Sequence, residues 1–151
     1  MLDQKPADFT LPSTGGKTFR LEEHAGTKLV IYFYPKDSTP GCTMQGQNFR
    51  DAYDGFRKAN CEIVGISRDS IKSHESFKAR QDFPFDLLSD AKETVCNQFG
   101  VIKMKSMYGK QVRGIERSTF VVDAKGVVRA EWRRVKLPGH VGEVLAFVKS
   151  L

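Results

Sequence analysis

A cysteine stands where the first long helix of this chain should begin. Cys42 is the second-last residue of the stretch YPKDSTPGCT, which starts at the last residue of LVIYFY, the longest apolar run in the sequence. The free N–H groups and the positive dipole end of a helix N-terminus favour an anion. Helix N-termini and neighbouring cations lower a cysteine pKa from about 8.5 to roughly 3.5–7.5. The position of Cys42 therefore predicts a reactive thiolate.

Three further residues could complete a site around that sulfur. The Thr39 hydroxyl can donate a hydrogen bond from the turn, and Gly41 lets the backbone come close to a substrate. Arg117 is the candidate for a fixed positive charge, because it directly precedes STFVVD, a strand expected beside LVIYFY. An arginine stays charged and offers several donors in a planar fork. A thiolate held by such donors is an activated nucleophile.

Hydrophobic periodicity predicts the elements that position these residues. Apolar side chains without alternation indicate buried strands over residues 29–34 and 62–67. Helical spacing of apolar residues indicates a helix from Cys42 to Lys58. Pro35 and Pro40 make the chain leave the sheet and turn before this helix begins.

The rest of the chain predicts further alternation of strands and helices. Asp69 or Ser70 is expected to cap a second helix. PFDLLSD is expected to form a strand whose final Ser-Asp caps a short helix, which carries Cys96 and ends at Gly100. A hairpin of residues 118–123 and 127–132 and a last amphipathic helix carrying Val141 and Val148 should follow. The N-terminal segment, which contains STGGK, is expected to be a loop. This order predicts an α/β protein with a thioredoxin-like fold, whose mixed central sheet has helices on both faces.

Composition bounds the classes of function. A chain of 151 residues with 40% apolar residues can bury one core, so a single domain over residues 1–151 is expected. The net charge of +6 could indicate nucleic-acid binding, but most basic residues alternate with acids, and the denser segment from Lys103 to Arg117 reads as a solvated loop. No leader or membrane segment is recognised, and no long exposed apolar stripe indicates an interface with a partner. We expect a cytoplasmic monomer.

The cysteine count argues against structural disulfides and metal. Cys42, Cys61 and Cys96 are odd in number and widely spaced, unlike the framework of a secreted domain. Zinc prefers close cysteine pairs, and no histidine lies near a cysteine in sequence. Cys96 reads as inert packing on its helix and Cys61 as a semi-buried residue at a strand edge.

The run FYPKDSTPGCT resembles the active-site signature P-x-x-x-T-x-x-C of peroxiredoxins, and TPGCT is similar to their bacterioferritin comigratory protein, or PrxQ, subfamily. The likeness covers nearly the whole chain through ADFTLP, VGIS, LLSD and ERSTFVVDAKG. It implies a thioredoxin-like peroxidase of antioxidant defence that uses thiol electrons to reduce hydrogen peroxide and organic hydroperoxides to water and alcohols. It implies no metal, flavin or haem.

The resemblance also implies a role for each matching residue. Cys42 would attack the terminal peroxide oxygen and become a sulfenic acid, which Pro35 would shield from solvent. Thr39 would orient the peroxide, with help from the backbone amide of Cys42. Arg117 would stabilise the thiolate and the charge on the departing oxygen, and Gln45 would position Arg117.

One position departs from the subfamily. Many PrxQ proteins carry a resolving cysteine five residues after the peroxidatic one, where this chain has Gln47, and others carry it in the next long helix, where ESFKARQDF has none. An external thiol such as glutathione, glutaredoxin or thioredoxin is the favoured reductant, which makes a one-cysteine enzyme. Resolution by Cys96 comes second, and Cys61 could act within or between chains. Slow resolution predicts easy inactivation at high peroxide.

Three other classes of function fit the residues less well. A thiol–disulfide oxidoreductase of thioredoxin fold without peroxidase activity is the main alternative, but it normally needs C-x-x-C, which Cys42 lacks. A cysteine hydrolase needs a histidine base, and none of the three histidines has local support. A basic binding module would show salt-dependent binding to nucleic acid without peroxidase activity.

Overall fold

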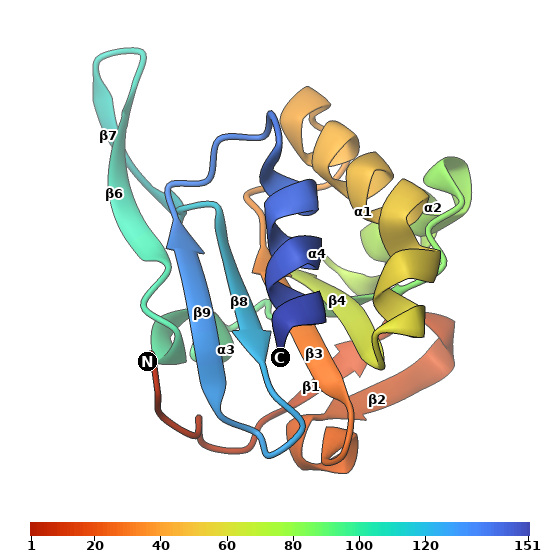
Figure 1. The fold of residues 1–151 in the computed structure, drawn as a ribbon. Coiled ribbons are helices and arrows are strands. Elements are labelled where there is room, and N and C mark those ends of the chain that lie inside the picture. The colour runs from red at the N-terminus through yellow and green to blue at the C-terminus, as the bar shows by residue number, and fades with distance from the viewer.

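A seven-stranded mixed sheet forms the centre of the computed structural model, which describes residues 1–151 (Figure 1). The strands are β1 (Thr10–Ser13), β2 (Lys17–Arg20), β3 (Lys28–Phe33), β4 (Cys61–Ser67), β5 (Asp86–Ser89), β6 (Ile102–Met107), β7 (Lys110–Ile115), β8 (Ser118–Val122) and β9 (Val128–Arg133). The order in the central sheet is β2-β1-β5-β4-β3-β8-β9. Strands β3, β4 and β5 run parallel, whereas β8 lies antiparallel to β3. The sheet is therefore mixed and β8 lies beside β3, as the sequence predicts.

Helices cover both faces of this sheet, which confirms the predicted architecture. They are α1 (Pro40–Lys58), α2 (Ile71–Gln81), α3 (Thr94–Gln98) and α4 (His140–Ser150), with short 3-10 turns at Thr14–Gly16 and Leu21–His24. Val30 and Tyr32 of β3 belong to the core shared with α1, α2 and α4, whereas Ile31 and Phe33 belong to the core shared with α3. Because both faces of β3 are buried, its sequence shows no alternation. None of the helices is long and apolar enough to cross a membrane.

Helix α1 begins at Pro40 and thus two residues earlier than predicted. Thr39 is the N-cap, with extended backbone, and Pro40 takes the first helical position. A proline fits there because its fixed φ suits the helix and its missing N–H would have had no partner. Cys42 is therefore the third residue of the helix and not its first. The predicted end at Lys58 is confirmed.

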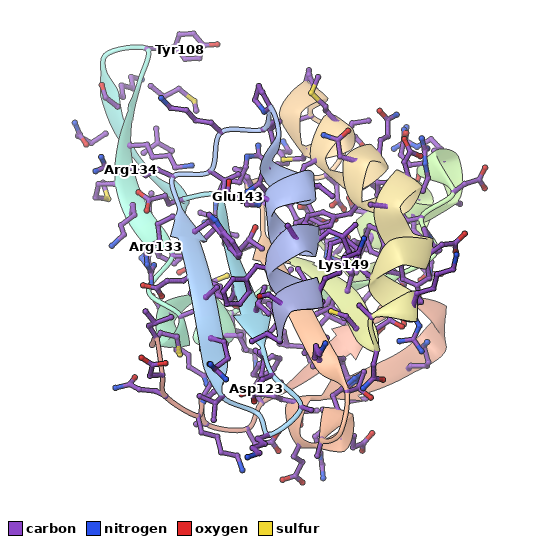
Figure 2. All side chains as sticks on the ribbon, in the orientation of Figure 1. Tyr108, Asp123, Arg133, Arg134, Glu143 and Lys149 are labelled. Atoms are coloured by element: carbon purple, nitrogen blue, oxygen red, sulfur yellow. The ribbon has the colours of Figure 1, made fainter.

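Two segments that read as loops are β-hairpins. The start of the chain pairs β1 with β2, and Gly15 and Gly16 turn between them with φ of 81° and 68°. The segment from Lys103 to Arg117 contains β6 and β7, a separate two-stranded sheet that extends away from the body (Figure 1). Its turn has positive φ at Tyr108 and Gly109, and Tyr108 projects from the tip with 97% exposure (Figure 2). Side chains exposed on both faces leave no hydrophobic alternation to read.

The caps of the two middle helices differ in how well the sequence predicts them. Ser70 caps α2 by accepting a hydrogen bond from the Ser73 N–H at 3.2 Å, as expected. The prediction that Ser89-Asp90 caps α3 is wrong, because the N-cap residue is Glu93, which has a left-handed backbone conformation. The Asp90 carboxylate still accepts a hydrogen bond from the first turn, from the Cys96 N–H at 2.7 Å. The predicted Gly100 follows α3 with φ of 67°.

Candidate active site

The sulfur of Cys42 is buried in the first turn of α1, just beyond the carboxyl end of β3. Cys42 is only 2% exposed. The helical ladder begins with the Thr43 N–H, which donates to the Thr39 carbonyl at 2.9 Å. The N–H groups of Gly41 and Cys42 precede it and have no partner within the helix. They are free to donate to an anion beside the sulfur.

Arg117 is the positive charge beside this sulfur. The pairing of β3 with β8 sets Phe33 opposite Ser118, so Arg117 lies next to the end of β3. Its Nη2 donates to the Cys42 sulfur at 3.5 Å and its Nη1 to the Gln45 Oε1 at 2.5 Å. One guanidinium thereby joins the thiol to an amide one helical turn further along α1.

Gly41 and Gln45 leave room for that guanidinium and fix it. A Cβ at Gly41 would lie 3.1 Å from the Nη2 of Arg117, so a larger residue would press on the guanidinium. Gln45 is completely buried, and its Nε2 has no hydrogen-bond partner in the protein. An unpartnered buried donor is costly. The amide is therefore held where it can serve the arginine and a bound molecule together.

Thr39 and Pro35 shape the turn that precedes the helix. The Thr39 hydroxyl donates to the Lys36 carbonyl at 2.8 Å, so it closes the turn, and its oxygen lone pairs stay available to accept a hydrogen bond. Pro35 is half-buried at the start of the turn. Its role in shielding a sulfenic acid stays a prediction.

The other two cysteines lie away from the site. Cys96 belongs to the core with α3, on the opposite face of the sheet from Cys42. Cys61 opens β4 and pairs with Lys28, at the end of β3 remote from Cys42. It is fully buried in an interior strand, so the expectation of a semi-buried edge residue is wrong. Six residues of β3 span about 20 Å, which far exceeds the reach of a disulfide.

Burial makes both of these thiols poor nucleophiles. It raises the pKa of the Cys61 thiol to about 12. Burial, and then a hydrogen bond to the Asp90 carboxylate, raise the pKa of the Cys96 thiol well above its usual value. All three cysteines are free. At neutral pH Cys61 and Cys96 hold their protons, and the thiolate is the reactive form.

Lys105 is a second cation of this region that the sequence does not reveal. Its Nζ donates to the Ile115 carbonyl, two residues before Arg117. Burial, and then the charge of Arg117, lower the pKa of Lys105. Burial first and the nearby Cys42 second raise the pKa of the Tyr32 hydroxyl. Lys105 was expected in a solvated loop, whereas β6 carries it toward the site.

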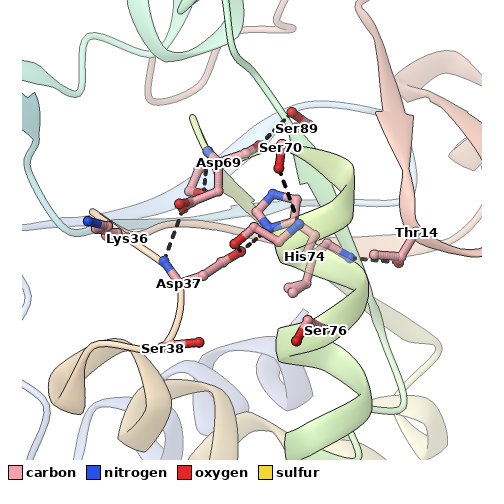
Figure 3. Close-up of polar contacts among 12 residues, drawn as sticks. Thr14, Lys36, Asp37, Ser38, Asp69, Ser70, His74, Ser76 and Ser89 are labelled. Atoms are coloured by element: carbon pink, nitrogen blue, oxygen red, sulfur yellow. Dashed lines mark hydrogen bonds and ion pairs between the residues drawn. The ribbon is translucent and has the colours of Figure 1, made fainter.

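One group of potential metal ligands includes Asp37, which stands in the turn between β3 and α1. Ligand atoms of Asp37, Asp69 and His74 lie within 4.8 Å of one another (Figure 3). The His74 Nδ1 lies 2.7 Å from the Asp37 Oδ2, and the Asp69 Oδ2 accepts from the Asp37 N–H at 3.0 Å. These donors and acceptors satisfy one another. The cluster escapes sequence reasoning because its members come from three separate segments.

Comparisons with known proteins agree in one family. The model of the AhpC/TSA family matches residues 2–131. Peroxiredoxin Bcp of Xanthomonas campestris pv. campestris is 53% identical, with 99% of this chain and 95% of that protein covered. Peroxiredoxin Bcp of Bacillus subtilis is 41% identical, with 99% and 96% covered.

Solved structures agree with the sequence relatives. The structure of Xanthomonas campestris peroxiredoxin Q matches with a TM-score of 0.90 and 54% identity, over 94% of this chain and 90% of that one. A cysteine-to-serine mutant of Xylella fastidiosa PrxQ matches with a TM-score of 0.91 and 42% identity, over 99% and 92%.

Proposed function

Because the chain belongs to the AhpC/TSA family, among the Bcp/PrxQ peroxiredoxins, and is a thiol-dependent peroxidase, we propose that Cys42 is the residue that peroxide oxidises. One observation carries this assignment: the Nη2 of Arg117 lies 3.5 Å from a sulfur buried in the first turn of α1. Neither of the other two sulfurs accepts a hydrogen bond from a lysine or arginine, and burial raises the pKa of both thiols. The relatives support a peroxidase and not the alternative thiol–disulfide oxidoreductase.

The reaction begins when the Cys42 thiolate attacks the terminal oxygen of a hydroperoxide. A sulfur–oxygen bond forms as the oxygen–oxygen bond breaks, and the departing oxygen leaves with the bonding electron pair. Cys42 becomes a sulfenic acid, and the departing oxygen takes up a proton to give water or an alcohol. Negative charge moves from sulfur to oxygen during this step, so donors placed around both atoms stabilise the transition state.

The donors for that charge come from two sources. The N–H groups of Gly41 and Cys42 point from the helix start, and Arg117 adds its guanidinium, which Gln45 fixes. Thr39 contributes an acceptor for the hydrogen of the peroxide. These groups are already in position before the substrate arrives, so little reorganisation is needed.

Both hydrogen peroxide and organic hydroperoxides are proposed substrates. The Xanthomonas campestris bacterioferritin comigratory protein, which has a matching solved structure, is described by its alkyl peroxide reduction activity.

We propose that an external thiol reduces the sulfenic acid. The Cys42 sulfenic acid and one thiol condense to a mixed disulfide and water, and a second thiol then releases Cys42 and forms a disulfide with the first. Cys96 lies across the sheet and Cys61 lies at its far end, so neither reaches Cys42 without large unfolding. Gln47 is held by Gln81 of α2 through a hydrogen bond of 2.9 Å. Glutathione, glutaredoxin and thioredoxin are the candidate reductants.

The remaining parts of the proposal concern the whole protein. We propose that residues 1–151 form a single domain that acts as a monomer. A cytoplasmic location is supported by three free thiols, since disulfides persist mainly in oxidising compartments.

Trapping of the intermediate tests the proposal. The protein is treated with one equivalent of hydrogen peroxide and then with dimedone, and adducts and disulfides are mapped by mass spectrometry. We expect the adduct on Cys42 and loss of peroxidase activity in Cys42→Ser, with activity retained in the matched Cys61→Ser and Cys96→Ser variants. Peroxidase activity that survives in Cys42→Ser would refute the assignment.

A further inference from the structure

The turn between β3 and α1 is held from beneath by one buried carboxylate. Asp37 accepts hydrogen bonds from the Tyr34 hydroxyl at 2.6 Å and from the Ser73 hydroxyl at 2.8 Å, and its Oδ2 lies 2.7 Å from the His74 Nδ1. Asp37 is 6% exposed and His74 is completely buried. Ser73 and His74 belong to α2, so this helix holds the turn that leads to Cys42 (Figure 3).

A hydrogen must lie between His74 and Asp37. The His74 Nε2 lies 2.9 Å from the Leu88 carbonyl, which only accepts, so Nε2 carries a hydrogen. Without a further hydrogen, lone pairs of Nδ1 and Oδ2 would face each other at 2.7 Å. The hydrogen makes a neutral, satisfied pair out of two buried groups. Removal of either partner leaves the other without compensation, which is strongly unfavourable.

The same turn is tied to its surroundings at two more points. The Asp37 N–H donates to the Asp69 Oδ2 at 3.0 Å, and the Arg80 Nη2 of α2 donates to the Ser38 hydroxyl at 2.8 Å. Ser38 has a left-handed backbone with φ of 63°, which a residue with a side chain adopts at a cost. Such a conformation persists only when its surroundings hold it. The ties from α2 and from Asp69 therefore set where the turn, and with it Thr39, lies.

Because Cys42 is buried, the hydrogen bonds that hold the turn must break before a larger thiol can reach its sulfur. A peroxide is small enough to reach a sulfur that is 2% exposed, whereas a thiol on a larger molecule must bring its own sulfur to within bonding distance. The turn of residues 35–39 leads directly into the first turn of α1, which carries Cys42, so it has to move for that encounter. The closed turn serves oxidation by peroxide, and an open turn serves reduction by a thiol.

We propose that the His74–Asp37 pair is the latch that holds the turn of residues 35–39 closed for oxidation of Cys42, and that the pair separates when an external thiol reduces the sulfenic acid. His74 and Asp37 are positioning residues, since neither touches the reacting atoms. This inference rests on the proposed function of Cys42. It predicts opposite effects on the two halves of the catalytic cycle.

Variants of the pair separate a latch from a structural role. In His74→Phe and Asp37→Ala we expect oxidation of Cys42 by hydrogen peroxide to slow by about tenfold and reduction of its sulfenic acid by glutathione to accelerate by a similar factor. The double variant should behave like either single one, because both remove one interaction. Asp37→Asn should stay near wild type, since its amide N–H can donate to a neutral His74 Nδ1.

A labelling experiment tests the latch independently of catalysis. Without peroxide, the rate at which Cys42 reacts with a polyethylene-glycol maleimide, relative to small iodoacetamide, reports how often the turn opens. We expect this ratio to rise by about tenfold in His74→Phe and Asp37→Ala but not in Asp37→Asn. The ratio of the two labelling rates measures opening of the turn even if Cys42 is not the residue that peroxide oxidises. The dimedone experiment tests that assignment separately.

Two controls keep the inference falsifiable. Val148→Ala removes volume from the core on α4, away from the turn, and should lower stability without changing the labelling ratio. Arg80→Ala removes an exposed hydrogen bond to Ser38, so we expect the protein to fold and the labelling ratio to rise by a few-fold, in line with one lost hydrogen bond. A labelling ratio that is unchanged in His74→Phe and Asp37→Ala, or half-reactions that slow together in His74→Phe and Val148→Ala alike, would overturn the latch.

Discussion

The Nη2 of Arg117 lies 3.5 Å from the sulfur of Cys42, although 75 residues separate them in the chain. The antiparallel pairing of β8 with β3 creates this contact by bringing the start of one strand to the end of the other. The position of the charge therefore depends on a rigid sheet and not on a loop. A site built in this way holds its donors ready for the charge of the transition state.

Replacement of Arg117 by lysine should slow oxidation of Cys42 by about 10²-fold, as the loss of one preorganised donor does elsewhere. A lysine ammonium is a compact charge that cannot copy the planar fork joining Cys42 and Gln45. Stopped-flow measurement of the second-order rate with hydrogen peroxide checks this. Arg113→Lys on β7 is the matched control, because Arg113 pairs with Glu93, and its rate should equal that of wild type. A rate for Arg117→Lys within twofold of wild type would show that charge alone suffices.

The Oε1 of Gln45 should support the oxidation of Cys42 by holding Arg117 in place. In Gln45→Leu the Nη1 of Arg117 loses its acceptor, and we expect oxidation of Cys42 to slow by about tenfold, as for a lost hydrogen bond to a charged group. Gln45→Glu keeps an oxygen in the same place and should stay within a few-fold of wild type. The same stopped-flow assay compares the two variants. Equal rates in both would mean that Gln45 only fills space.

Gly41→Ala should reduce activity while leaving stability nearly intact. Its new Cβ would lie 3.1 Å from the Nη2 of Arg117 and push the guanidinium away from the sulfur. We expect a loss of about tenfold in the oxidation rate and a change below ~1 kcal/mol in the free energy of unfolding, since alanine suits a helix better than glycine. Gly142→Ala in α4 is the control, because its Cβ meets no atom within 4 Å. A normal oxidation rate in Gly41→Ala would show that the arginine has room to adjust.

Local pattern predicts the half of the site that lies on one segment. The buried strand before Pro35 and the helix after Pro40 follow from periodicity, and they place Thr39, Gly41 and Cys42 together. Arg117 could be added because the pairing of its strand with β3 follows from the expected topology. The family signature then supplies a role for each residue.

The parts that sequence reasoning misses depend on contacts between distant segments. His74 stands among polar residues on α2, so nothing local shows that it is buried against Asp37 and Leu88. Lys105 reaches the site from a hairpin whose two exposed faces carry no periodic signal. The Nε2 of His140 lies 2.8 Å from the hydroxyl of Thr119 on β8, which stands 21 residues away in the chain. Burial of a polar side chain is decided by its partners, which only the folded chain assembles.

Cys61 should make the protein less stable at alkaline pH. Burial raises the pKa of its thiol in the folded state from 9.0 to about 12, so the folded protein holds this proton more tightly than the unfolded chain does. The resulting stabilisation is complete below about pH 9 and is lost as the pH rises toward 12. For one such proton the free energy of unfolding falls by about 1.4 kcal/mol per pH unit in this window.

Urea unfolding of wild type and Cys61→Ala between pH 7 and about pH 11 measures this contribution. The variant loses a buried side chain and should be less stable at pH 7. Its curve should then fall less steeply above about pH 9, by ~1.4 kcal/mol per pH unit, so the two curves converge. Tyr53, whose pKa is raised to about 12 by burial and by its hydrogen bond to Glu62, keeps some slope in both proteins. Parallel curves would mean that Cys61 ionises in the folded protein as readily as in the unfolded chain.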